Sequence, residues 1–98
     1  MNSLPTPTAL AVNVMVKDES LAVELADGRV ISVPLVWYPR LVHGDEGERN
    51  NWLLLNQGGG IRWPALDEDI SVENLLVGKP SDESQASLKL WLAGRLKT

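Results

Sequence analysis

Apolar residues recur at every second position in two short runs, Leu10–Val16 and Leu21–Leu25, and a third apolar run covers Val30–Val33. Because successive side chains point to opposite faces of a strand, this spacing is typical of strands with one buried face. The last two runs are separated by Asp27-Gly28, a strong signal for a tight hairpin turn, which in its type I′ form needs positive φ at both residues. The runs therefore predict an antiparallel meander, and no other feature constrains the fold as much.

Two shorter strands are predicted further along the chain. The apolar run Trp52–Leu55 indicates the first, and Ile61–Trp63 indicates the second, which ends at Pro64 because proline has no N–H to donate. The glycine triplet between them lacks the lysine of a phosphate-binding loop, so a hairpin loop is the favoured interpretation. We expect an α+β fold, with an antiparallel sheet of about five strands, short helices on one face and a C-terminal helix.

A short helix is predicted from Val72 to Val77. Ser71 is a suitable N-cap, since its hydroxyl can accept a hydrogen bond from the first turn. Glu73 falls in that turn, where the helix dipole favours a carboxylate. Gly78 stands where helices commonly end in a left-handed residue, and a proline follows soon after.

A last helix is predicted to start at a cap on Ser81 or Asp82 and to end near Leu96. Its apolar residues share one stripe at helical spacing, namely Leu88, Trp91, Leu92 and Leu96. Leu90 lies off that stripe. Two interpretations stay open: the helix docks on the domain with Leu90 exposed, or it projects and uses Leu90 and Trp91 to bind a partner or a second copy.

The segment from Leu35 to His43 predicts a short helix with Pro39 at or near its first turn. Trp37, Tyr38 and Arg40 combine aromatic and basic side chains, which are enriched at interface hot spots. The alternative is that the aromatic residues fill the core of a protein without phenylalanine. Both interpretations stay open.

Three consecutive acids, Asp67, Glu68 and Asp69, precede the short helix. Adjacent carboxylates can bind Mg²⁺ or share a proton. A solvated acidic turn is the favoured interpretation, because charge runs usually face water and no neighbouring residue completes a metal site.

Composition excludes several classes of function. The 98 residues make one domain, and the absence of cysteine excludes disulfides and thiolate metal sites. A single histidine, His43, cannot build a zinc site, so no cofactor is expected. The net charge of −4 disfavours direct binding to nucleic acids. No apolar run is long enough to span a membrane, and we expect a cytoplasmic protein.

Three blocks of the chain carry a resemblance to a known family: DGRVISVPLVWYPRL, ERNNW and GIRWPALDEDISVENLLVG. Together they resemble the prokaryotic domain-of-unknown-function family 2442, from about Val12 to about Trp91. The resemblance implies a small α+β fold and a gene neighbourhood beside another small protein, in an arrangement suggestive of toxin–antitoxin pairs. It implies no catalytic residues.

We therefore expect a flexible tail at residues 1–8, an α+β domain at residues 9–79, and a helical segment at residues 80–98 that packs on the domain or associates. The expected function is a non-catalytic protein-binding module, antitoxin-like or regulatory, whose partner is a small co-encoded protein; a homodimer through the last helix is also considered. The alternative is an acidic inhibitor that mimics nucleic acid. An enzyme using Asp67, Asp69 and His43 is the least favoured hypothesis, because the sequence shows no nucleophile–base pair.

Overall fold

The computed structural model describes residues 9–96 and has an α+β fold. The predicted meander is confirmed: β1 (Ala11–Lys17), β2 (Ser20–Leu25) and β3 (Val30–Pro34) form an antiparallel sheet in the order β1-β2-β3. The expected buried face is confirmed on β2, where Leu21 and Val23 are fully inaccessible to solvent. On β1 it is wrong at one position, because the register shifts between Ala11 and Asn13, so that Ala11 is buried and Val12 is exposed. The apolar pattern thus located this sheet, but it did not reveal the irregularity at the start of β1.

The turn between β2 and β3 differs from the type I′ prediction. Gly28 has a φ of 95°, but Asp27 is not among the residues with positive φ. The Leu25 N–H donates to the Arg29 carbonyl oxygen at 2.8 Å, and Asp27 accepts from the Arg29 N–H. A single left-handed glycine after the turn is the geometry of a slightly longer hairpin loop with a bulge.

A second antiparallel sheet contains β4 (Leu53–Leu55), β5 (Gly60–Trp63) and β6 (Glu68–Ser71) in that order. The prediction of one sheet of about five strands is therefore wrong in detail, because there are two sheets of three strands each. The missed strand is β6, whose acidic residues suggested a turn. Only Asp67 has turn geometry, with a left-handed φ of 50°.

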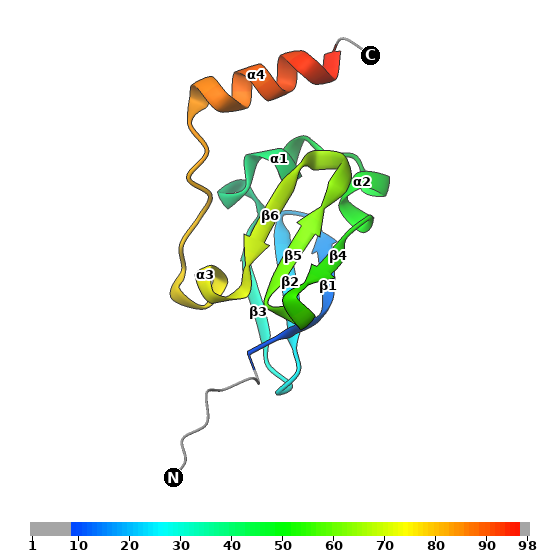
Figure 1. Ribbon diagram of the computed structural model, residues 1–98, viewed down its shortest axis with the longest axis vertical. Helices are drawn as coiled ribbons and strands as arrows, with labels where there is room; N and C mark the ends of the chain where they lie inside the picture. The colour runs from blue at the N-terminus through cyan, green and yellow to red at the C-terminus, as the bar shows by residue number, and fades with distance from the viewer. Residues whose placement is uncertain (1–8, 97–98) are drawn as a thin grey trace.

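One hydrophobic core joins the two sheets. The second sheet lies in front of the first in Figure 1, and the buried cluster draws residues from both. Trp63 and Ile61 of β5 are fully buried, as is Leu41 from a neighbouring helix. The Trp63 indole N–H donates to the Arg49 carbonyl oxygen at 3.0 Å, so the largest buried ring also satisfies its one polar group.

Two short helices, α1 (Pro39–His43) and α2 (Glu46–Asn50), lie at one end of the sheets (Figure 1). They follow the 3₁₀ turn η1 (Leu35–Trp37), and Pro39 occupies the first turn of α1 as predicted. Two further 3₁₀ turns, η2 (Asn56–Gly58) and η3 (Pro64–Leu66), connect the strands of the second sheet.

The helix predicted after β6 is confirmed as α3 (Val72–Val77). The Ser71 hydroxyl accepts from the Asn74 N–H at 2.9 Å, and Gly78 ends the helix with a left-handed φ of 74°. Leu75 is buried, whereas its neighbour Leu76 is exposed.

The last helix, α4 (Gln85–Leu96), begins later than predicted. Its first turn is capped by Ser84, whose hydroxyl accepts from the Ser87 N–H at 3.0 Å. Asp82 and Glu83 therefore belong to the linker before the helix. The predicted tail at residues 1–8 lies outside the described residues, as do residues 97 and 98. Within residues 9–96, no helix has the length and apolar character needed to cross a membrane.

Candidate protein-binding site

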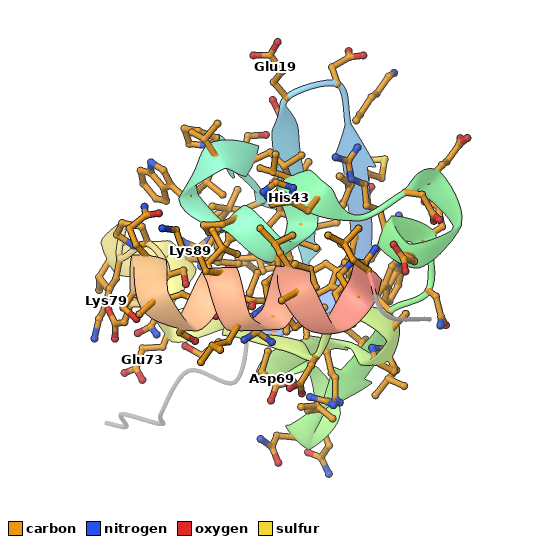
Figure 2. The ribbon with its side chains drawn as sticks, turned by 90° about the horizontal axis from the view of Figure 1, so that it is seen from above. Glu19, His43, Asp69, Glu73, Lys79 and Lys89 are labelled. Carbon is orange, nitrogen blue, oxygen red and sulfur yellow. The ribbon has the colours of Figure 1, made fainter. Side chains whose placement is uncertain are left out.

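The linker and α4, residues 79–96, form a segment that we call the arm. The linker runs extended from α3 toward the end of the molecule that carries α1 and α2, and α4 then lies across that end (Figure 1). Seen from above, α4 passes between His43 of α1 on one side and Asp69 of β6 on the other (Figure 2).

The linker is attached to the domain through main-chain groups. The Ser81 N–H donates to the Trp37 carbonyl oxygen at 3.1 Å, and the Tyr38 hydroxyl donates to the Lys79 carbonyl oxygen at 3.4 Å. These two bonds hold the linker beside η1 and place its end next to α1.

Arg40 of α1 is the centre of the contacts between domain and arm. Its Nε and Nη2 atoms donate to the Glu83 carboxylate at 2.6–3.0 Å, and its Nη1 donates to the Asp67 carbonyl oxygen at 3.0 Å. The side chains are 15% and 8% exposed for Arg40 and Glu83 respectively. The hydrogen bond from Arg40 lowers the pKa of Glu83, so the pair stays ionised at neutral pH.

The ring of Trp91 on α4 lies between two guanidinium groups. The Cζ atoms of Arg40 and Arg95 are 4.9 Å and 4.8 Å from its centroid, within the range of cation–π attraction. Arg95 also donates to the Glu48 carboxylate at 2.8 Å, and this bond lowers the pKa of Glu48. Glu48 is held in place because it belongs to the capping box of α2.

The acidic segment is largely neutralised by arginine. Arg62 on β5 contacts Asp69 at 2.8 Å and Asp67 at 3.1 Å. Glu68 is half-buried, and burial raises its pKa to about 7, against the opposing influence of nearby Arg40. Asp67 and Asp69 are largely exposed, as the favoured interpretation expects, but Asp69 lies on a strand at the edge of a sheet, and both acids pair with Arg62.

A groove of about 700 Å³ opens between α4 and the domain. Arg95 and Trp91 form part of its wall, and Leu90 and Leu96 line its outer side with 76% and 85% of their surface exposed. The complete lining is Glu48, Ala65, Leu90, Trp91, Gly94, Arg95 and Leu96. Within residues 9–96, no three histidine, aspartate or glutamate side chains are grouped so that they could hold a metal ion.

The structure brings some predicted site residues together and separates others. Arg40 contacts both Asp67 and Trp91, which the sequence did not link. Tyr38 is in the core and Trp37 packs partly against it, so the core interpretation of these aromatic residues describes their placement. Leu90 is exposed on α4, beside the groove.

Sequence reasoning missed Glu48, Glu83 and Arg95 as partners in this site. Glu83 was assigned to the first turn of a helix, and Arg95 to its last turn. The one available signal was helical spacing, since Arg95 lies four residues after Trp91 and therefore on the same face.

Comparison with known proteins identifies the domain but no activity. A family model described as protein of unknown function (DUF2442) matches residues 11–81, which end before α4. The crystal structure of a protein of unknown function from Rhodospirillum rubrum ATCC 11170 superposes with a TM-score of 0.65 at 23% identity. It covers 79% of this chain and 93% of that chain, and at this identity it shows a shared fold. No curated protein matches the chain.

Proposed function

Because the chain belongs to the DUF2442 family of proteins of unknown function, we propose its role from its surface: a non-catalytic protein-binding module that contacts its partner through α4. Support comes mainly from one observation, the exposure of Leu90 and Leu96 beside the groove. Ala86 and Ala93 lie on the same side of the helix as Leu90, at spacings of four and three residues. Together they present a narrow apolar stripe that a partner can cover.

The groove adds the residue types that dominate interface energetics. Trp91 and Arg95 form part of it, and tryptophan and arginine are the side chains most often found at hot spots. Both are already held by contacts with the domain, so little conformational entropy remains to be lost on binding. A partner that inserts an apolar side chain beside Trp91 would be recognised by a preorganised surface.

The partner that we propose is a small co-encoded protein, with the chain acting as its antitoxin-like or regulatory counterpart. This choice rests on the gene neighbourhood that the family resemblance implies. The alternative of an acidic inhibitor has less support, because Arg40 and Arg62 pair with the carboxylates that would mimic phosphates.

Co-expression with the protein of the adjacent gene tests the proposal. The wild-type chain should co-purify with its neighbour, and Leu90→Asp should weaken the complex at least tenfold, because a carboxylate cannot be desolvated in an apolar contact without a partner. Titration calorimetry on the purified pair measures the loss.

Val77→Asp is the matched control. Val77 on α3 is 71% exposed, so it is as accessible as Leu90 but lies outside the groove. This variant should bind like the wild type. Equal loss in both variants, or no complex with the wild-type chain, would refute the assignment to α4.

A further inference from the structure

We propose that the arm is exchangeable: residues 79–96 of one copy dock on the domain of a second copy, and its arm docks in return. The result is a symmetric dimer that repeats the contacts of the closed monomer. The proposal concerns self-association and goes beyond the function proposed above, so either one can fail without the other.

The docking surface fits one occupant by charge and by shape. Arg40 of the domain pairs with Glu83 of the arm, and Glu48 of the domain pairs with Arg95. The ring of Trp91 then fills the space beside Arg40. A second copy presents the same groups in the same positions, so its domain accepts the arm without any new complementarity.

The arm can leave without opening the core. All fully buried apolar residues among residues 9–96 lie between Ala11 and Leu75, hence outside the arm. No residue of α4 is buried, and the residues facing the domain, Leu88, Trp91, Leu92 and Arg95, are only partly covered. Departure of the arm therefore breaks two ion pairs, the hydrogen bonds of Lys79 and Ser81, and the half-buried contacts of α4. A second domain can replace all of them.

The linker supplies a hinge. Gly78 adopts a left-handed φ of 74°, with nothing within 4 Å of the position of an added Cβ. Residues 79–84 contain neither helix nor strand. Because Lys79, Ser81 and Glu83 dock together with α4, changes in φ and ψ near Gly78 have to redirect the whole arm toward a neighbouring molecule.

Exchange depends on protein concentration. A short linker gives docking within one chain an effective concentration of the order of millimolar. The wild-type chain should therefore be a monomer at about 10 µM and approach a dimer at about 1 mM. Removing the competing closed form should shift dimerisation to micromolar concentrations.

Two charge reversals weaken the closed form in separate molecules, because each replaces the attraction between Glu48 and Arg95 by repulsion. In Glu48→Arg, the new arginine lies opposite Arg95 of the same chain and repels it. In Arg95→Glu, the new glutamate lies opposite Glu48 and repels it in the same way. When the two variants are mixed, an exchanged heterodimer contains one normal pair and one reversed pair, and both are attractive. Each variant alone has only repulsive pairs in either the closed or the exchanged form.

Light scattering and native mass spectrometry on the mixture give the readout. At about 20 µM, well below the effective concentration of closed docking, the mixture should show a heterodimer near twice the 10.7 kDa of one chain. Each variant alone should stay monomeric, as should the double variant Glu48→Arg/Arg95→Glu, whose closed pair is restored. Glu46→Arg, a reversal on the same helix away from Arg95, should give no heterodimer with Arg95→Glu.

Two results would overturn the exchange: a mixture that stays monomeric, or a variant that dimerises alone, which would place the contact elsewhere. Glu48→Arg also removes the capping box of α2, so its circular dichroism is compared with that of the double variant. A concentration series of the wild-type chain needs no substitution. A constant mass of 10.7 kDa up to about 1 mM would also refute the proposal.

Discussion

Glu68 is the side chain whose ionisation is most coupled to the fold. Its pKa rises from an ordinary 4.5 to about 7 because burial disfavours the charged form, and neighbouring Glu83, Asp69 and Asp67 act in the same direction. A raised pKa in the folded state means that the folded protein binds the proton more tightly than the unfolded chain. The stabilisation is complete below pH 4.5 and is lost as pH rises to about 7.

Glu68→Gln should remove this dependence on pH. We expect wild-type stability to fall by about 1–2 kcal/mol across that window, after allowance for the partial exposure of the carboxyl. The glutamine variant should lack this fall and be the more stable protein at pH 8. Urea unfolding at several pH values measures both curves, and parallel curves would show that Glu68 is not the titrating group.

Gly58 is the glycine that the packing of the two sheets requires. Its φ is 108°, and an added Cβ would lie 2.6 Å from the carbonyl oxygen of Ala11 in β1. Gly58→Ala should therefore destabilise the protein by roughly 2–4 kcal/mol, because both strain and a backbone clash oppose it.

Gly94→Ala in α4, where nothing lies within 4 Å of the added Cβ, should instead stabilise its helix by up to about 1 kcal/mol. Thermal unfolding of the two variants gives opposite shifts.

At the scale of elements, the strands of the core and the arm differ in what holds them in place. Arg40 holds the arm by its ion pair with Glu83 and its stacking on Trp91. Arg40→Met keeps much of the length of the side chain but removes both interactions. The amides of α4 should then exchange with solvent roughly 10- to 30-fold faster, a loss of about 1–2 kcal/mol, while those of β2 stay protected.

Arg29→Met is the control for this exchange experiment. Arg29 also pairs with a carboxylate, that of Asp27, but the pair is exposed in a hairpin loop. Exposed pairs contribute little to stability, so protection in α4 should be unchanged. Equal acceleration in both variants would show that charge in general, and not the Arg40 contacts, governs the docking of α4.

Elements with a strong local signal were predictable from the sequence. The alternation in β1 to β3 and the Ser71 cap with Gly78 located the meander and α3. β6 was missed because its alternation covers only Glu68–Ser71, and its acids resemble a loop unless Arg62 is known to lie opposite. The start of α4 was missed because Ser81 and Asp82 are as acceptable as Ser84 for a cap, and the sequence does not show that Glu83 binds the distant Arg40.

The arrangement of the whole molecule could not be predicted from the sequence, because it depends on contacts between residues that are far apart in the chain. The packing of the two sheets involves the close approach of Gly58 to Ala11, which brings together residues 47 positions apart. The candidate site depends on ion pairs between residues 43 and 47 positions apart, Arg40 with Glu83 and Glu48 with Arg95. Local patterns identify the residue types of such a site, but only the folded chain shows which of them meet.

The match to the family ends at residue 81, and Arg40 and Glu48 of the domain each form an ion pair with the arm. In evolutionary terms, docking of this kind can arise through few substitutions. Changes at these few positions could strengthen or weaken the docking of a C-terminal helix, with the core of the domain left under its own, separate selection.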